Sequence, residues 1–390
     1  MPVLAWFVDN PWHALSGMRD PSWKNFFLAV TDHTFIDPLE LAIRKLHELA
    51  EEGQAAGSGE PVPARNPKLG PAAANHGEGA AGVAQPAGSP RVFHMPLAGC
   101  PRSMEESRAY AERRGKGRDD DFAPPPGEVV FAGRSVFPEY ASYFAGQNIP
   151  EELLVEAEKL CAKGVRADFD WWAKRMGLPG ERGFWPGKAS RVPGLGAAAS
   201  NRIWRRQRLV AAMSLGLTLY GDEGWASLLC HAGSSLPELV YGERPDESEG
   251  GNATRDRKFA QCRYNLDLRP QFDYYAHVYE VYNGAPFTLN LNSLIMSAGL
   301  TQRIYDTWLA DGFCITDNSA GLSIFPDELT HAVTFNEPEE LPGLVRYFSE
   351  SPGNKEELRR AWKNEILEKH TYRTRLETLL AQLRQAGAAR

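Results

Sequence analysis

Short apolar runs alternate along this chain with longer segments in which apolar residues recur at helical spacing. A strand buried on both faces of a parallel sheet carries apolar residues at nearly every position, so each short run predicts a buried strand. The runs occupy residues 3–8, 26–31, 91–97, 128–133, 217–221, 287–291 and 313–316. Helical spacing predicts helices at 38–52, 150–177, 200–214, 302–311, 337–349 and 354–384, and around Tyr275, Val278, Tyr279 and Tyr282.

The alternation of strands and helices predicts an α/β protein with doubly wound parallel sheets. In such sheets ligands bind beyond the carboxyl ends of the strands, where the strand order reverses. The residues that follow the predicted strands are therefore candidates for a binding site, namely Asp9, Asn10, Gly133, Gly221, Asp222, Asn292, Ser293 and Asp317.

Two stretches interrupt this pattern. Residues 53–90 are rich in Gly, Ala, Pro, Ser and Asn and have too little apolar surface to offset the entropy of ordering, which predicts a flexible insertion. Residues 105–127 are charged and then Pro-rich, which predicts a hinge between two domains, 1–125 and 126–390. A polar loop is expected at 242–258, and the helical segments after residue 140 form an insertion in the second domain.

Composition narrows the function classes. The net charge of −7 argues against a general binder of nucleic acid or anionic membranes, which needs a positive surface. The five cysteines are scattered without CxxC spacing, so neither a zinc site nor a disulfide framework is suggested. The chain shows no signal peptide and no apolar run of the ~20 residues that span a bilayer. We expect a cytoplasmic protein without a cofactor.

Arg303 lies in the first turn of the predicted helix 302–311, where the helix dipole disfavours a cation by ~0.3–1 kcal/mol. An arginine there is explained if an anion such as a diphosphate sits at the helix N-terminus, held by backbone N–H groups and the guanidinium. Taken alone, a surface ion pair for Arg303 and a solvated position for Asp306, one turn further, are the simpler interpretations.

A set of motifs in the segment from about 270 to 385 resembles the donor-binding domain of spore-maturation CgeB-like glycosyltransferases. The matching residues are Leu289-Asn290, Gly299-Leu300-Thr301, Arg303, Tyr305-Asp306, Ala310, Gly312, Thr316-Asp317, His370-Thr371-Tyr372 and Arg375. Residues 131–134 and 219–222 with Trp225 resemble the first two strands and turns of that domain. Residues 6–11, 30–32 and 94–98 resemble the acceptor-side domain that precedes it.

The resemblance implies a GT-B fold, with two Rossmann-like domains facing a cleft and a short, interrupted first domain. It implies transfer of a sugar from a nucleoside-diphosphate donor to a protein, glycan or cell-envelope acceptor, with retention and without a metal. Arg303 and Asp306 are then the predicted catalytic residues. The other donor-binding residues would be Gly133, Arg134, Gly221, Asn292, Gly299, Leu300, Thr301 and Asp317, and the acceptor-side residues Asp9, Asn10 and His13.

Two departures from the family pattern support an alternative. Related retaining enzymes carry an acid eight positions before the second one, and Ala298 stands there; that second acid is usually Glu and is Asp306 here. The first domain is also short. The alternative is a degenerate subunit that binds a sugar nucleotide or a partner without turnover, in a homo- or hetero-oligomer formed through the first domain.

For several other groups of residues, a structural or solvent-exposed role is a simpler interpretation than a functional one. Asp119, Asp120 and Asp121 suit a solvated linker better than a metal site, and His231 suits a core or loop position better than a catalytic base. The basic group of Arg202, Arg205, Arg206 and Arg208 suits a structural role better than RNA binding. Tyr274, Tyr275, Tyr279 and Tyr282 suit core packing better than stacking on a base or sugar.

Overall fold

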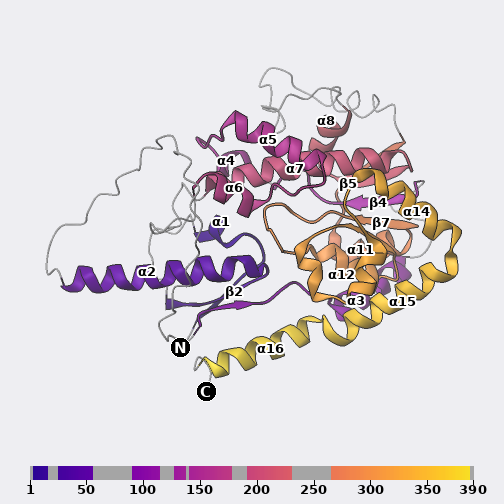
Figure 1. Ribbon diagram of the computed structural model, residues 1–390. Coiled ribbons are helices and arrows are strands. Elements are labelled where there is room, and N and C mark those ends of the chain that lie inside the picture. The colour runs from indigo at the N-terminus through magenta and orange to yellow at the C-terminus, as the bar shows by residue number, and fades with distance from the viewer. Residues whose placement is uncertain are drawn as a thin grey trace.

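The computed structural model describes residues 3–15, 25–55, 90–114, 127–137, 140–177, 191–230 and 265–386. Within these ranges the chain forms two α/β units, each built on a parallel sheet (Figure 1). This confirms the predicted α/β class with two Rossmann-like units. Most of the predicted insertion at 53–90, the predicted loop at 242–258, Asp119 to Asp121 and His231 lie outside the described residues.

The first unit is a three-stranded parallel sheet in the order β1-β2-β3. Its strands are β1 (Leu4–Phe7), β2 (Phe27–Val30) and β3 (Val92–His94), joined by α1 (Pro11–Leu15), the 3-10 helix η2 (His33–Phe35) and α2 (Ile36–Ala55). Strand β1 is an edge strand, with Leu4 42% and Trp6 37% exposed. The prediction that β1 is buried is therefore wrong, because it pairs with β2 on one side only.

The second unit is a six-stranded parallel sheet in the order β6-β5-β4-β7-β8-β9. The strands are β4 (Val129–Ala132), β5 (Leu217–Gly221), β6 (Leu266–Pro270), β7 (Phe287–Asn290), β8 (Cys314–Asp317) and β9 (Thr334–Phe335). This is the doubly wound order in which the direction of winding reverses between the first and fourth strands, here β4 and β7. The sequence pattern missed β6, whose alternating polar residues suit a half-exposed strand, and the two-residue β9.

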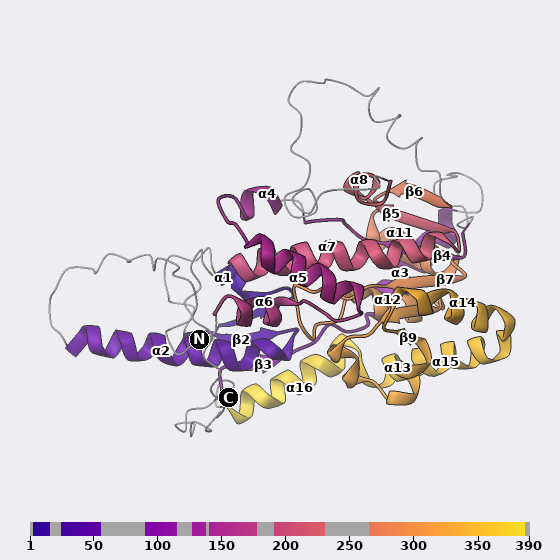
Figure 2. The ribbon, with the colours of Figure 1, turned by 45° about the horizontal axis from the view of Figure 1, so that its top comes forward.

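Parallel crossovers are right-handed, so connections that wind toward β6 and those that wind toward β9 cover opposite faces of this sheet. Helices α7 (Arg191–Met213) and α8 (Gly224–Cys230) follow the first direction; α11 (Tyr274–Asn283), α12 (Gln302–Leu309) and α13 (Asp327–Val333) follow the second (Figure 2). Further elements are α4 (Tyr140–Tyr143), α5 (Glu151–Ala162), α6 (Phe169–Arg175), η5 (Ala320–Ile324), η6 (Pro338–Glu340), α14 (Leu341–Glu350), α15 (Pro352–Lys369) and α16 (Tyr372–Gln385).

Part of the predicted hinge at 105–127 is helical. Helix α3 (Pro101–Arg114) packs on α11 of the second unit, where Ser107 donates to the Ala276 carbonyl at 3.0 Å and Arg114 pairs with Glu280 at 2.9 Å. Alanine, arginine and glutamate are good helix formers, and that propensity outweighs the high charge. The packing places α3 with the second unit, while the division into 1–125 and 126–390 stays a prediction.

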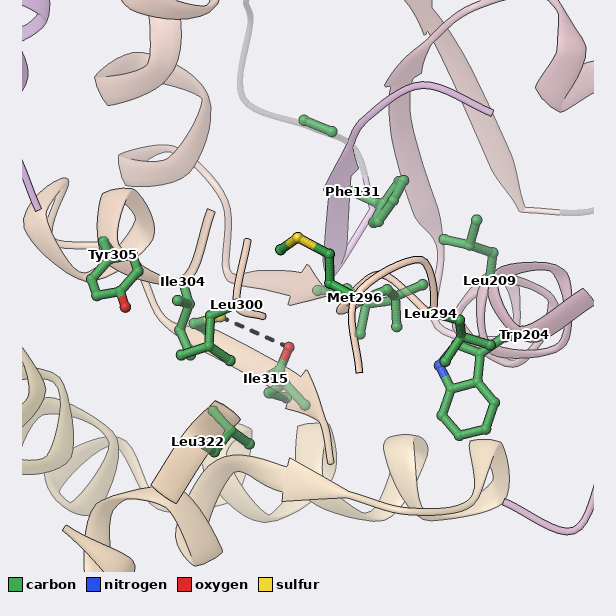
Figure 3. Packing of buried hydrophobic residues seen from close by; sticks show 14 of the residues in the cluster. Phe131, Trp204, Leu209, Leu294, Met296, Leu300, Ile304, Tyr305, Ile315 and Leu322 are labelled. Atoms are coloured by element: carbon green, nitrogen blue, oxygen red, sulfur yellow. Dashed lines mark hydrogen bonds between the residues drawn. The ribbon is translucent and has the colours of Figure 1, made fainter. Parts of the chain in front are cut away.

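The two units share one hydrophobic core. Phe35 of the first unit meets Phe169 of the second edge to face, with ring centroids 5.5 Å apart. The loop after β7 supplies Leu294, Met296 and Leu300 to this core (Figure 3). Each fully buried side chain of this size contributes about 1.5–3 kcal/mol relative to exposure, so the loop is anchored by its apolar residues.

Helix α16 crosses from the second unit back to the first (Figures 1 and 2). Its Leu379 and Leu383 pack with Ala29, Phe93 and Met95 of the first sheet in a second, smaller core. The C-terminal helix thus holds both units together.

Candidate functional site

A cavity of about 350 Å³ opens at the carboxyl ends of β4 and β5, next to the point where the strand order reverses. This is where doubly wound sheets bind ligands. The described lining residues come from the second unit and are Ala132, Gly133, Arg134, Tyr220, Gln271, Phe272, Tyr274, Tyr282, Thr301, Gln302 and Arg303. The predicted binding residues Gly133, Arg134, Thr301 and Arg303 therefore lie together.

The N-terminus of α12 faces this cavity without a side-chain cap. Thr301 occupies the N-cap position, but its hydroxyl donates to the Asn290 side-chain oxygen at 2.5 Å and accepts nothing from the helix. The first N–H groups of a helix have no partner within the helix and carry a partial positive charge. The Ile304 N–H donates to the Thr301 carbonyl at 3.3 Å, so without a side-chain cap among the described residues the N–H groups of Gln302 and Arg303 are the ones left for an anion.

Arg303 is buried against the cavity wall, with only 8% of its surface exposed. One terminal nitrogen donates to the Asn290 side-chain oxygen at 3.2 Å and the other to the Ala132 carbonyl. The guanidinium lies 4.5 Å from the Phe131 ring centroid, and its Nε has no partner among the described residues. The surface ion pair is thus the wrong interpretation. A buried cation whose described partners are all neutral favours an anionic ligand.

Gly133 follows β4 and passes directly over Arg303. A Cβ at this position would lie 3.0 Å from the terminal nitrogen of Arg303 and 3.3 Å from the Phe131 ring. The Gly133 N–H donates to the Tyr220 carbonyl at 2.9 Å, and its own carbonyl accepts from the Trp225 indole at 2.8 Å. These bonds fix the loop, and the missing side chain keeps the guanidinium accessible.

Gly221 does not line the cavity. Its Cβ would meet the Trp225 ring at 2.4 Å and the Gly133 carbonyl oxygen at 2.7 Å, so glycine is needed for the close approach of the loops after β4 and β5. Asp222 then anchors the β4 loop, because its carboxylate accepts from the Ser135 N–H at 2.8 Å and the Gly224 N–H at 3.0 Å. Both residues shape the cavity from behind.

Asp306 is buried, with 6% exposure, and also stands behind the cavity wall. Its two oxygens accept from the Tyr274 hydroxyl at 2.9 Å and from the Gln302 side-chain nitrogen at 3.0 Å. Burial raises the pKa of this carboxyl to about 6. The solvated position is the wrong interpretation, and Asp306 holds two residues that do line the cavity.

Asn292 and Asp317 are fully buried and belong to a polar network beneath the cavity. The Asp317 carboxylate accepts from the Trp204 indole at 2.7 Å, from Arg166 at 3.3 Å and from the Asn292 N–H at 2.8 Å. Neither residue is in the lining, although both were predicted to bind the donor. A hydrogen-bonded buried carboxylate of this kind fixes the loop after β7.

The Gly299 loop is held by a residue of the 30–32 motif that the sequence did not assign to a binding site. Asp32, at the end of β2, is fully buried and accepts from the Ala298 N–H at 2.9 Å and the Gly299 N–H at 3.1 Å. A Cβ on Gly299 would lie 2.1 Å from the Met296 methyl group, and Leu300 is a core residue. Of the predicted loop 299–301, Thr301 lines the cavity, whereas Gly299 and Leu300 do not.

The predicted acceptor-side residues lie away from this cavity. Asp9 is exposed after β1, whereas Asn10 is buried and donates to the Ile295 carbonyl at 3.2 Å. His13 lies between aromatic rings, with Tyr143 at 5.1 Å and Phe144 at 5.9 Å between centroids. Burial lowers the His13 pKa to about 4, so the imidazole is neutral at pH 7. Asn10 and His13 pack the junction between the two units.

Aromatic residues form one wall of the cavity. Tyr220 meets Phe272 edge to face at 5.2 Å, and Phe272 stacks with Tyr274 at 6.0 Å. Sequence reasoning missed Gln271, Phe272 and Gln302, since they follow the unrecognised β6 or carry no motif, and it assigned the tyrosines to the core. Tyr275 is 71% exposed, so the core prediction is wrong for that residue.

The basic group on α7 points inward, as its structural interpretation predicted. Arg208 is fully buried over the Trp204 ring and donates to the Asn336 carbonyl at 2.8 Å. Arg205 donates to the Arg134 carbonyl at 3.1 Å and Arg206 to the Leu228 carbonyl at 3.0 Å. Of these three contacts, only that of Arg205 reaches a residue that lines the cavity, Arg134.

Two further findings concern the described residues only. They contain no group of three or more His, Cys, Asp or Glu side chains placed to hold a metal ion. None of their helices is long and apolar enough to cross a membrane.

Residues 205–381, somewhat under half of the chain, match the family model described as glycosyl transferase-like. A search of curated proteins gave no match. The fold is similar to the UDP-forming α,α-trehalose-phosphate synthase of Burkholderia xenovorans, at 9% identity and TM-score 0.43, over 100% of this chain and 69% of that one.

Two other solved structures are similar over a shorter part. The N-terminal domain of Candida albicans trehalose-6-phosphate phosphatase shows 10% identity and TM-score 0.37, over 76% of this chain and 50% of that one. The α,α-trehalose 6-phosphate synthase of Burkholderia multivorans shows 12% identity and TM-score 0.37, over 76% and 51%. This chain thus spans about half the length of those two proteins. The domain that contributes most of the cavity wall is glycosyltransferase-like.

Proposed function

We propose that the chain transfers a sugar from a nucleoside-diphosphate donor to a hydroxyl acceptor. The observation that carries the proposal is Arg303, a buried guanidinium whose partners among the described residues are neutral and which lines a cavity at the N-terminus of α12, where no side chain caps the helix. A diphosphate supplies the missing negative charge and several acceptor oxygens. The aromatic wall of Tyr220, Phe272 and Tyr274 supplies a surface on which the rest of the nucleotide stacks.

The residues present suit the charge that develops during this reaction. The bond between the anomeric carbon and the diphosphate oxygen breaks, and its electron pair leaves with the diphosphate. The acceptor oxygen bonds to the anomeric carbon, and its proton passes to the departing phosphate. Arg303 and the first N–H groups of α12 stabilise the growing negative charge, which is the electrostatic role that dominates such catalysis.

The direct test is to measure nucleotide binding by titration calorimetry. UDP, GDP, ADP and dTDP are titrated into the wild-type chain, Arg303→Ala, and the control Arg360→Ala, whose side chain is 70% exposed on α15. We expect at least one nucleotide to bind wild type and the control, and Arg303→Ala to bind it at least ~30-fold more weakly, as for a buried charged hydrogen-bond donor. A wild-type chain that binds none of the four contradicts the proposal.

The finer properties belong to the same proposal. We expect retention of the anomeric configuration, activity without an added metal, and a protein, glycan or envelope acceptor. The test is NMR of the product formed in the presence of EDTA, because the coupling constant of the anomeric proton reports its configuration. An inverted product, or activity that EDTA abolishes, contradicts this part.

A binding subunit without turnover is the second candidate. It is favoured by the absence of any carboxylate among the described residues that line the cavity, together with Ala298 where related enzymes carry an acid. The two candidates differ in turnover. Donor hydrolysis or transfer by wild type that is lost in Arg303→Ala supports the enzyme, whereas tight nucleotide binding with no product supports the subunit.

A further inference from the structure

Gln302 connects the cavity to three other parts of the molecule. It lines the cavity as the first residue of α12, and its side-chain nitrogen donates to the Ala98 carbonyl at 2.9 Å and to Asp306 at 3.0 Å. Its side-chain oxygen accepts from the Tyr372 hydroxyl at 2.8 Å. Ala98 lies in the segment after β3 of the first unit, and Tyr372 begins α16.

Asp306 carries the connection across the cavity wall to α11. Its second oxygen accepts from the Tyr274 hydroxyl at 2.9 Å, and Tyr282 lies within 3.4 Å of that hydroxyl. Both tyrosines line the cavity. One carboxylate thus sets the relative position of Tyr274 on one side and Gln302 on the other.

The residues that reach Gln302 are themselves fastened together, and we call Ala98, Gly99, His370, Thr371 and Tyr372 the clasp. The Gly99 N–H donates to the His370 carbonyl at 2.8 Å, and the Tyr372 N–H donates to the Gly99 carbonyl at 3.2 Å. Gly99 and Thr371 form a parallel bridge. A Cβ on Gly99 would come within 2.8 Å of Ile366 and Leu309, so the contact is too close for a side chain.

We infer that Asp306 is a positioning residue for the nucleotide cavity, because it fixes the places of Tyr274 and Gln302 in the cavity wall. The clasp contributes to the same positioning, since Ala98 and Tyr372 both hydrogen-bond to the Gln302 side chain. The inference rests on the proposed function. Asp306 does not line the cavity; it holds Tyr274 and Gln302, which do, where we expect the ligand to meet them. The motif His370-Thr371-Tyr372 thereby gains a role, since it joins the first unit and α16 to the cavity wall.

The hydrogen-bond chemistry makes the role testable. Tyr274 and Gln302 both present donors to Asp306, and a carboxylate accepts both at once. Asparagine offers one oxygen and one NH₂ group, so Asp306→Asn loses one of the two contacts. Protonation of Asp306 has the same consequence, because the carboxyl oxygen that carries the proton then meets a donor and can no longer accept its hydrogen bond.

The groups around Asp306 leave this carboxyl as the one that titrates near neutral pH. Tyr274 and Tyr282 face it from α11 and Tyr372 from α16, and burial raises the pKa of all three hydroxyls, that of Tyr372 to about 12. Gln302, which does not titrate, and the Arg303 guanidinium face it from its own helix. With the Asp306 pKa raised to about 6, nucleotide affinity falls as the pH drops below that value.

The experiment uses the full chain and the tightest of UDP, GDP, ADP and dTDP. Its affinity is measured by calorimetry from pH 5 to 8 for wild type, Asp306→Asn, Tyr372→Phe and the control Tyr347→Phe, an exposed tyrosine of α14. At pH 7.5 we expect Asp306→Asn and Tyr372→Phe to bind about three- to tenfold more weakly, as for loss of one hydrogen bond. Below pH 6 wild type weakens and approaches Asp306→Asn.

The nucleotide's own phosphate titration is the same for every variant, so the difference between wild type and Asp306→Asn reports Asp306. Folded Asp306→Asn and Tyr372→Phe proteins that bind as tightly as wild type, with an unchanged pH profile, overturn the inference. If a variant unfolds, Tyr274→Phe removes a single hydroxyl from the same network and decides in its place. A wild type that binds no nucleotide instead removes the proposed function, and this inference with it.

Discussion

The carboxyl ends of the two sheets carry polar residues of similar kinds, and the two regions use them differently. At the first sheet, the side chains of Asn10 and Asp32 form hydrogen bonds with the backbone of the loop after β7. At the second sheet, Thr301 leaves the α12 N-terminus uncapped and Arg303 keeps an unpartnered Nε beside a cavity. A polar residue at a strand end binds a ligand only where the protein has not already satisfied it.

This comparison explains why several predicted donor residues line the cavity and the predicted acceptor residues do not. The backbone of the loop after β7 approaches the first sheet closely enough to satisfy its polar tips, as Asp32 shows. Among the described residues no carboxylate caps the N-terminus of α12 in the same way. Substitutions on the two sides therefore test one idea from opposite directions: stability should fall on the first side and ligand binding on the second.

The largest expected effect is on stability, from Asp32→Ala. The substitution leaves the Ala298 and Gly299 N–H groups buried without acceptors, which costs about 3–5 kcal/mol in the free energy of unfolding. Urea denaturation measures it, with Glu105→Ala on the exposed face of α3 as the control. A loss no larger than that of the control contradicts the view that Asp32 holds the loop.

Next in size is a pair of opposite pH effects. The His13 pKa is lowered to about 4, so its contribution to stability is lost as the pH falls from about 6.5 through 4. The Asp306 pKa is raised to about 6, so its contribution is present below about 3.8 and is lost as the pH rises through 6. Each spans about 3 kcal/mol in the free energy of unfolding.

Thermal unfolding from pH 4 to 7 of wild type, His13→Gln and Asp306→Asn measures both contributions by difference. The difference between wild type and His13→Gln should rise with pH, and that between wild type and Asp306→Asn should fall. Slopes of the same sign would show that one of the two side chains is hydrated in solution.

Within the second unit, two glycine substitutions distinguish a residue that lines the cavity, Gly133, from one that packs behind it, Gly221. In Gly133→Ala the new methyl group meets Arg303 at 3.0 Å, so we expect nucleotide affinity to fall about tenfold with a loss of stability of about 1 kcal/mol. In Gly221→Ala the methyl group strikes Trp225 and the Gly133 carbonyl, so stability should fall by about 2–3 kcal/mol. Calorimetric titration measures the loss of nucleotide affinity in each variant, and melting curves measure the loss of stability. An equal loss of affinity in both variants, compared at matched stability, would contradict the view that only Gly133 lines the binding cavity.

The smallest effect is expected from Asp9→Ala. Asp9 is exposed after β1 and no described residue forms a hydrogen bond with its side chain, so stability should change by less than about 0.5 kcal/mol. Nucleotide affinity should not change either. A raised KM for the acceptor with unchanged donor KM would restore Asp9 to the acceptor side, where the family resemblance placed it.

The sequence by itself determined the strand runs, the parallel class and the strand-to-helix unit from β7 through α12. Strands buried in a parallel sheet are apolar at nearly every position, and an arginine in the first turn of a helix opposes the helix dipole, so both features are visible in the local pattern. It missed β6, because that half-exposed edge strand lacks the apolar pattern, and it overestimated the burial of β1, whose apolar run lies at a sheet edge. It also missed α3, whose charge resembles that of a linker.

Only the tertiary structure decided which polar residues line the cavity. Asp306, Asn292 and Asp317 have the same side-chain chemistry as binding residues, yet each is surrounded by partners from distant parts of the chain. Asp32 and Gln302 gained their roles from contacts more than two hundred residues away. Satisfaction of a buried polar group depends on where the rest of the chain packs, and a local motif does not contain that information.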